Sequence, residues 1–201
     1  MQIRIIKPGM LSTIQDSGRY LYLSQAVPVS GAMDILSARM ANLVVGNDDN
    51  VAVIEFTYAN AEFIAETDML IAYSGDGATL TAANTNMPTE RPLFIPAGTT
   101  IRLINNPLGS RTYLSVAGGW DVPEVLGSRS TYVTAALGGL QGRALQSGDL
   151  LNSASHLTQI SINILNSLKS SSVNYSNWSL AHPVLLAADK KNIRVVKAKE
   201  F

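Results

Sequence analysis

Four polar segments of the 201-residue sequence stand out as candidates for chemistry. The first, residues 13–19 (TIQDSGR), brings Gln15, Asp16 and Arg19 together in a predicted loop after the first strand. Its composition alone favours a turn, in which Asp16 bonds to the local backbone and Gly18 takes a positive φ. The residue types by themselves therefore do not separate a turn from a binding loop.

The second segment, residues 28–34 (PVSGAMD), leads into a predicted helix. The N-terminus of a helix presents free N–H groups and a partial positive charge, which suits a carboxylate or a phosphate. A capping motif, supplied by Ser30 or Asp34, is the alternative interpretation. Farther along the same helix, Asn42 is polar among apolar neighbours, so it either bridges locally or reaches a pocket.

The third candidate is Glu55, which lies in a predicted strand on the same face as Val51 and Val53. Burying a carboxylate without a partner is costly, so Glu55 should either pair with an arginine or serve a site. In a site, burial would raise its pKa into a useful range. A solvent-facing side chain is the alternative.

The fourth segment, residues 111–149, combines glycine pairs with Arg129 and Arg143. Glycine lets the backbone approach a ligand or another strand closely, and arginine supplies forked donors for a carboxylate or a phosphate. The segment therefore suits an anionic substrate or a phosphorylated intermediate, although tight bends at the corners of a barrel would also explain the glycines. No Walker-type phosphate loop is present, and His156 and His182 match no zinc spacing, so no metal site is predicted.

Composition narrows the class of protein. Hydrophobic residues make up 46% and charged residues 15%, so the chain can bury a sizeable core. A formal net charge of zero argues against a nucleic-acid partner, and the absence of cysteine excludes disulfides and thiol chemistry. The sequence shows neither a signal peptide nor an apolar run of roughly 18 residues, so we expect a cytoplasmic protein without a membrane partner.

The hydrophobic pattern predicts a mainly β fold with one prominent helix. Residues 1–7 alternate between apolar and polar side chains, and other short runs predict strands at 51–58, 61–65, 69–74, 78–82, 93–96, 100–104 and 112–117. Many short strands at close spacing favour a barrel or a sandwich. Residues 33–45 have apolar side chains at helical spacing. Residues 152–179 predict a polar connector, in which the alternation of Ile160, Ile162 and Ile164 favours a strand.

Taken together and in order, the motifs resemble one family closely. The matching elements are residues 13–19, 27–34, 41–42, 45–47, Glu55, 113–119, 125–131, 138–145 and 148–149. This ordered set over residues 1 to about 151 resembles the carboxyltransferase-domain family, subdomains A and B, also called allophanate hydrolase subunit 2. The family includes the C subunit of bacterial 5-oxoprolinase, the antagonist of a sporulation-kinase inhibitor, and half of the carboxyltransferase domain of urea carboxylase.

The resemblance implies a fold of cyclophilin-like β-barrels. It divides the chain into a barrel domain at residues 1–151, a Ser/Asn-rich connector at 152–192 and the start of a second barrel at 193–201. Members of the family are usually longer than this chain, so we expect the second barrel to be missing or truncated here.

The resemblance also implies a function, that of the C subunit of an ATP-dependent 5-oxoprolinase, which opens the lactam of 5-oxoproline to glutamate with subunits A and B and is inactive alone. ATP would bind this chain or a partner subunit. Asp34 and Glu55 would handle protons, and the substrate-binding residues would be Gln15, Asp16, Arg19, Ser30, Gly31, Asn42, Arg129 and Arg143. Two alternatives stay open, a biotin-dependent carboxyltransferase component that resembles urea carboxylase and a non-enzymatic regulator that binds a kinase-inhibitor homologue.

Overall fold

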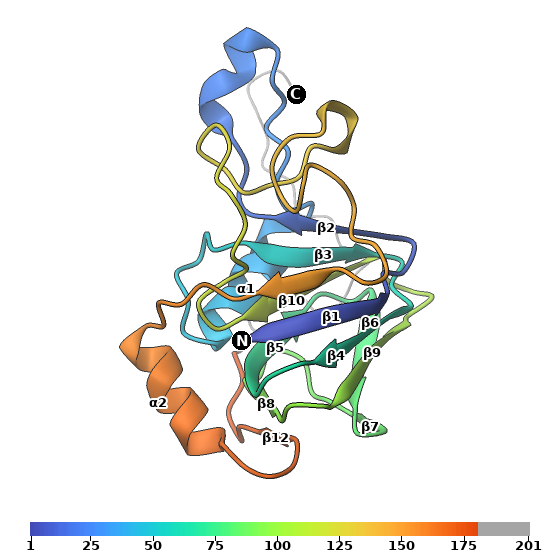
Figure 1. The fold of residues 1–201 in the computed structure, drawn as a ribbon, viewed down its shortest axis with the longest axis vertical. Helices are drawn as coiled ribbons and strands as arrows, with labels where there is room; N and C mark the ends of the chain where they lie inside the picture. The colour runs from blue at the N-terminus through green and yellow to red at the C-terminus, as the bar shows by residue number, and fades with distance from the viewer. Residues whose placement is uncertain (181–201) are drawn as a thin grey trace, which may run out of the picture.

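Two six-stranded antiparallel sheets enclose the main hydrophobic core (Figure 1). The computed structural model describes residues 1–180 of the chain. The first sheet has the order β11 (Leu150–Asn152), β1 (Gln2–Lys7), β4 (Ala61–Ala65), β9 (Thr100–Asn105), β6 (Ala78–Ala82) and β7 (Thr85–Asn86). The second has the order β12 (Asn174–Tyr175), β8 (Leu93–Ile95), β5 (Met69–Ser74), β10 (Arg111–Val116), β3 (Val53–Thr57) and β2 (Leu11–Gln15). The predicted mainly β fold is confirmed.

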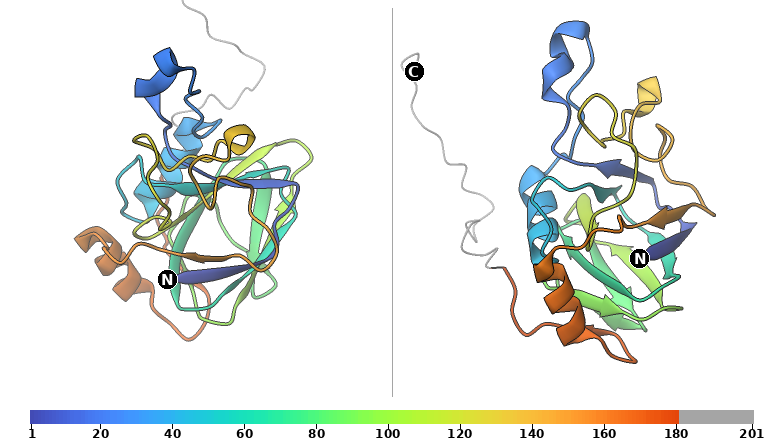
Figure 2. Two further views of the ribbon diagram at one scale, coloured as in Figure 1. Left: turned by 45° about the horizontal axis from the view of Figure 1, so that its top comes forward. Right: turned by 60° about the vertical axis from the view of Figure 1, so that its left-hand side comes forward.

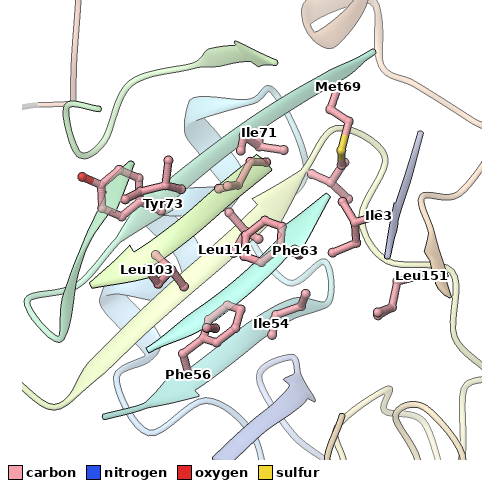
Figure 3. Packing of buried hydrophobic residues seen from close by; sticks show 14 of the residues in the cluster. Ile3, Ile54, Phe56, Phe63, Met69, Ile71, Tyr73, Leu103, Leu114 and Leu151 are labelled. Atoms are coloured by element: carbon pink, nitrogen blue, oxygen red, sulfur yellow. The ribbon is translucent and has the colours of Figure 1, made fainter. Parts of the chain in front are cut away.

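The alternation of side chains along the strands builds the core between the sheets (Figure 3). In β1, Ile3 and Ile5 are buried while Arg4 between them is exposed, as the period of two requires. Phe56 of the second sheet and Phe63 of the first stack with their ring centroids 6.3 Å apart and so join the two sheets. Each large apolar side chain buried in this way contributes about 1.5–3 kcal/mol to stability.

Helix α1 (Ile35–Val44) packs on the other face of the second sheet, where Ala38 and Ala41 meet Val53 and Tyr113. Its small side chains allow the helix to lie close to the strands. The Asp34 side chain caps the helix by accepting a hydrogen bond from the Ser37 N–H. The predicted helix is therefore confirmed, with Asp34 and not Ser30 as its cap.

One end of the molecule is built from loops. The short 3-10 helices η1 (Tyr20–Gln25) and η2 (Val133–Ala135) both project from this end (Figures 1 and 2). Hydrogen bonds between residues more than 100 positions apart join the segment before η1 to the segment before η2. The Thr131 N–H donates to the Ile14 carbonyl, and the Asp16 N–H donates to Ser130 Oγ. Two of the polar motifs of the sequence, residues 13–19 and 125–131, therefore meet at this end.

The predicted loop at residues 13–19 needs a correction, because its first half is the end of strand β2. The strand pairs with β3 from Leu11 to Gln15, and its Ser12 and Ile14 alternate with Thr13 and Gln15. The sequence lacks the period of two that predicts a strand here, because the apolar residues Leu11 and Ile14 lie three positions apart and so fall on opposite faces. The face that carries Thr13 and Gln15 is polar, and hydrogen bonds such as that from Gln15 Nε2 to Thr13 Oγ1 replace apolar packing there.

The predicted strand around Ile160–Ile164 is wrong, because residues Gln159–Leu168 form helix α2. The side chain of Thr158 caps the helix at the Ser161 N–H, and Ser161 Oγ donates to the Val45 carbonyl at the end of α1. Three isoleucines at alternate positions fit a strand over five residues, but the buried Ser161 and Leu168 lie seven positions apart, which is two helical turns.

The described residues cover only part of the predicted connector. Residues 181–192 of the connector and the predicted start of a second barrel at 193–201 lie outside them, so the domain division stays a prediction. None of the helices within residues 1–180 is long and apolar enough to cross a membrane.

Candidate functional site

Asp16 is the centre of a hydrogen-bonded cluster that we call the Asp16 clamp, formed with Gly18, Ser128, Arg129 and Ser130. Its Oδ1 accepts from the Gly18 N–H at 2.8 Å, from Ser128 Oγ at 2.6 Å and from Ser130 Oγ at 2.5 Å. Its Oδ2 accepts from the Arg129 N–H at 2.6 Å. The clamp joins the end of β2 to the loop that carries Arg129.

The charge of Asp16 strengthens this clamp. Burial alone would raise the pKa of the carboxyl, but the hydrogen bonds from Ser128, Ser130, Arg129 and Gly18 outweigh burial and hold the pKa below its ordinary value. All four donors point at an anion, and hydrogen bonds to an ionised group are stronger than neutral ones. Asp16 is thus placed to hold a loop in position.

Arg19 and Gln15 flank the clamp and bind backbone carbonyls. Arg19 is fully buried, and its Nη2 donates to the Ser130 carbonyl at 2.5 Å, whereas its Nη1 has no hydrogen-bond partner among residues 1–180. Gln15 Nε2 donates to Thr13 Oγ1 at 2.9 Å and to the Thr131 carbonyl at 3.3 Å. The structure therefore brings Gln15, Asp16 and Arg19 to one place.

Ser30 and Gly31 lie against this cluster through their backbone. Both have positive φ, 57° and 90°, and a Cβ added at Gly31 would lie 2.9 Å from the Ser17 carbonyl oxygen. The Ala32 N–H donates to the Asp16 carbonyl at 2.9 Å. The close approach of two backbones explains why glycine is needed at position 31.

A second group forms around Glu55 on the face of the sheet beside α1. Glu55 Oε2 accepts from the Met33 N–H and from the Tyr113 hydroxyl, both at 2.8 Å. The Arg111 guanidinium lies 3.6 Å from Oε1, an ion pair longer than a hydrogen bond. We name Glu55, Arg111, Tyr113 and the Met33 N–H the Glu55 group. Glu55 is buried, and it pairs with an arginine as burial of a carboxylate requires.

Tyr113 links Glu55 to the start of α1. Its hydroxyl donates to Glu55 and accepts from the Asp34 N–H at 2.7 Å. Burial, reinforced by the negative charge of Glu55, raises the pKa of Tyr113 well above its ordinary value, so the hydroxyl stays protonated at neutral pH. Asp34 itself is engaged as the cap, since its Oδ2 accepts from Ser37 Oγ at 2.5 Å.

Asn42 lies between α1 and the same face of the sheet, since it bonds to Ser115 of β10, and it links three parts of the chain. Its Nδ2 donates to the Val51 carbonyl at 2.6 Å, and its Oδ1 accepts from Ser115 Oγ at 2.6 Å and from Asn47 Nδ2 at 3.4 Å. These contacts fasten α1 to the start of β3 and to β10.

The two arginines of the fourth segment occupy different surroundings. Arg143 forms a bidentate pair with Asp149, with both N···O distances at 2.8 Å. Those hydrogen bonds hold the pKa of Asp149 below its ordinary value and raise that of Arg143. Arg129 pairs at 3.3 Å with Glu124, and it lines a cavity of about 340 Å³ together with Asp48, Asn50, Asp121 and Trp120.

Sequence reasoning missed four participants, namely Arg111, Tyr113, Ser128 and Ser130. Arg111 and Tyr113 lie two positions apart on one strand and so share the face that carries Glu55. Ser128 and Ser130 flank Arg129 in the same alternating way, and this pattern was the available signal. Within residues 1–180, no group of three or more His, Asp and Glu side chains is placed to hold a metal ion.

The chain is similar to known proteins over most of its length. The sequence profile described as "Carboxyltransferase domain, subdomain A and B" matches residues 25–201. The chain is 40% identical over 149 residues to the C subunit of the 5-oxoprolinase of Escherichia coli K12, covering 74% of this chain and 48% of that protein. It is 39% identical over 150 residues to urea amidolyase of Saccharomyces cerevisiae, covering 74% of this chain and 8% of that protein.

Structural comparison gives the same relationship. The crystal structure of the urea amidolyase of K. lactis aligns with a TM-score of 0.74 at 36% identity, covering 78% of this chain and 10% of the other. The chain spans about half the length of the oxoprolinase protein and a small part of the urea amidolyases.

Proposed function

Because the chain belongs to the family of the carboxyltransferase domain, subdomains A and B, we propose that it acts in the C subunit of an ATP-dependent 5-oxoprolinase. In this proposal it helps to convert 5-oxoproline to glutamate in a cytoplasmic complex with subunits A and B, and it is inactive alone. The observation that carries the proposal is the 40% identity over 149 residues to a protein named as the C subunit of 5-oxoprolinase.

The proposed reaction needs a carboxylate that is fixed in position and can accept a proton from the attacking water. A lactam is a poor electrophile, and phosphorylation of its carbonyl oxygen would create a leaving group for attack by water. Glu55 supports this proposal, because its Oε2 is fixed by Tyr113 and the Met33 N–H, whereas its Oε1 has no hydrogen bond within residues 1–180 and lies 3.6 Å from Arg111. A carboxylate fixed in this way can accept a proton without reorganising. Asp34 is the weaker candidate for this step, since it caps α1.

The two arginines that the sequence nominates for an anion, Arg129 and Arg143, suit ATP poorly. Arg143 is neutralised by Asp149, and Arg129 shares its cavity with Asp48 and Asp121. A triphosphate needs several unopposed donors and cations. We therefore assign ATP to a partner subunit and derive no step of this chain through it.

Substitution of Glu55 tests this function. The complex is reconstituted with homologues of subunits A and B, and 5-oxoproline-dependent glutamate release is measured with Glu55→Gln and, as control, Glu62→Gln. Glu62 pairs with Arg102 on the other sheet, so its loss should leave turnover unchanged. We expect a loss of at least roughly 100-fold for Glu55→Gln. Equal activity of the two variants would remove Glu55 from the mechanism.

A carboxyltransferase component of the urea carboxylase type is the second candidate, favoured by the 39% identity to urea amidolyase. In that case carboxybiotin on a separate carrier domain would donate the carboxyl group to urea. Biotin-dependent carboxylation of urea by the assembled complex, without oxoproline turnover, would select this candidate. A non-enzymatic regulator would need an exposed apolar face, and Leu21 and Leu23 of η1 provide exposed apolar side chains.

A further inference from the structure

The cavity beside Arg129 has the size and the mixed charge of a site for a small amino-acid-like molecule. Its volume of about 340 Å³ lies at the lower end of the range of ligand pockets. Its lining includes the polar residues Asp48, Asn50, Asp121 and Arg129 and the aromatic residue Trp120. The lining thus combines one guanidinium with two carboxylates.

The Asp16 clamp fixes the position of the arginine in this cavity. The Arg129 N–H donates to Asp16 Oδ2 at 2.6 Å, and the neighbouring Ser128 and Ser130 donate to Oδ1 of the same carboxylate. A second residue of the lining is tied to the same region, because Asn50 Oδ1 accepts from the Ser17 N–H at 2.9 Å. Arg129 and Asn50 of the lining are therefore both anchored next to Asp16.

The Arg129 guanidinium is available to a ligand. Its partner Glu124 lies 3.3 Å away, and the two side chains are 44% and 53% exposed. Ion pairs this exposed contribute at most about 1 kcal/mol, so a ligand carboxylate can replace Glu124 with little cost. Arg143 differs, because its bidentate pair with Asp149 occupies the guanidinium.

The net charge of the lining selects the ligand. The lining offers one guanidinium, which balances the single negative charge of a carboxylate but only part of the charge of a phosphate group, which carries up to two negative charges. A neutral amide such as urea would leave the charge of Arg129 unused. A molecule that carries one carboxylate and, close to it, an N–H group satisfies both signs, since the carboxylate meets Arg129 and the N–H meets Asp121 or Asp48.

We propose that the cavity binds a small carboxylate with an adjacent N–H group, held by Arg129 and by Asp121 or Asp48 of the same lining. The identity of the ligand rests on the proposed function, in which 5-oxoproline as the substrate and glutamate as the product share this chemistry. The proposal makes Arg129 a specificity residue that distinguishes carboxylated lactams from urea and from simple lactams.

Direct binding to the full chain provides a test that needs no turnover. 5-Oxoproline, glutamate, 2-pyrrolidinone and inorganic phosphate are titrated separately into the wild type, Arg129→Gln and Arg102→Gln by calorimetry. Arg102 is the matched control, because it is 48% exposed and pairs with Glu62 at 3.0 Å away from the cavity. Circular dichroism and thermal unfolding confirm that each variant is folded.

We expect 5-oxoproline or glutamate to bind the wild type and Arg102→Gln equally, and Arg129→Gln about tenfold or more weakly. The ligand with the higher affinity identifies the site as one for substrate or for product. 2-Pyrrolidinone, which lacks the carboxylate, should bind weakly and equally to all three proteins. Tighter binding of phosphate, equal affinities of the two arginine variants for the carboxylated ligands, or no binding of either ligand would overturn the proposal.

Kinetics in the assembled complex separate this inference from the proposed function. Arg129→Gln should raise the KM for 5-oxoproline more than it lowers kcat. Binding by the chain without turnover by the complex would contradict the 5-oxoprolinase function and leave the cavity assignment standing. Turnover with an unchanged KM in Arg129→Gln would refute the cavity assignment alone.

Discussion

Replacing Asp16 with asparagine should release the loop that carries Arg129. The new side chain keeps the size and one oxygen of the carboxylate, but it places an NH₂ group where Oδ2 accepts from the Arg129 N–H. Two donors then face each other in a buried site. The donors on the other oxygen, Gly18, Ser128 and Ser130, also lose the negative charge that strengthens their hydrogen bonds.

The magnitude follows from these contacts. Loss of a hydrogen bond to a charged group costs about 1.5–3 kcal/mol, and a buried donor left without an acceptor costs a further 1–3 kcal/mol or so. Asp16→Asn should therefore lower the free energy of unfolding by about 3–5 kcal/mol. Asp68→Asn is the control, because Asp68 is exposed and accepts one backbone N–H, from Ala97, so its replacement should cost less than about 1 kcal/mol.

Urea unfolding at several pH values measures both the size and the origin of the effect. Since the pKa of Asp16 is lowered in the folded protein, its contribution is fully present above the pKa of the unfolded chain, near 4, and is lost as the pH falls through the folded pKa. The stability difference between the wild type and Asp16→Asn should thus be constant from about pH 5 to 7 and shrink below about pH 4. A loss no larger than that of Asp68→Asn, or a difference that does not change with pH, would refute the clamp.

Three further predictions concern other contacts. Tyr113→Phe removes the acceptor of the Asp34 N–H and a donor to Glu55. It should therefore lower the free energy of unfolding in urea by about 1–3 kcal/mol and reduce turnover in the complex. Full activity would show that Tyr113 does not position Glu55. Gly142→Ala should lower the free energy of unfolding by at least about 1–3 kcal/mol more than Gly127→Ala, as measured by thermal unfolding. Both glycines have positive φ, but only at position 142 would a Cβ lie 2.1 Å from the backbone of Ala136. Equal losses of stability in the two variants would contradict this packing. A double-mutant cycle of Arg143→Gln and Asp149→Asn should give a coupling of about 1 kcal/mol at pH 7 that falls below about pH 4, since the pKa of Asp149 is lowered by this pair; a coupling independent of pH would refute the assignment.

Local pattern predicts much of this fold. The period of two marks strands such as β1, and the apolar spacing and Asp34 mark α1, because these signals depend only on neighbouring residues. The same reasoning fails for helix α2. Its isoleucines at alternate positions predict a strand, and the end of α1, on which the helix packs, lies more than 100 positions away in the sequence. Tertiary contact overrides local pattern there.

In the candidate site, too, local pattern predicts some features and tertiary contact decides others. We expected a buried Glu55 to pair with an arginine, but the sequence could not show that this arginine is Arg111, because its identity depends on the register of β10 against β3. Three of the four partners of Asp16, namely Ser128, Arg129 and Ser130, lie 112 to 114 positions away, so only the folding of the loops brings them to it. Residue types therefore identify Asp16 and Glu55 as candidate site residues, whereas only the structure identifies the residues that bind their carboxylates.

The proposed 5-oxoprolinase function is tested directly by leaving this chain out of the complex and then adding it back. Homologues of subunits A and B are assayed for 5-oxoproline-dependent ATP hydrolysis and glutamate release, first without the chain and then with increasing amounts of it. We expect glutamate release that requires the chain and saturates when the chain reaches a stoichiometric amount. Release that is unaffected by the chain, or a complex that assembles and forms no glutamate, would exclude the proposed 5-oxoprolinase function.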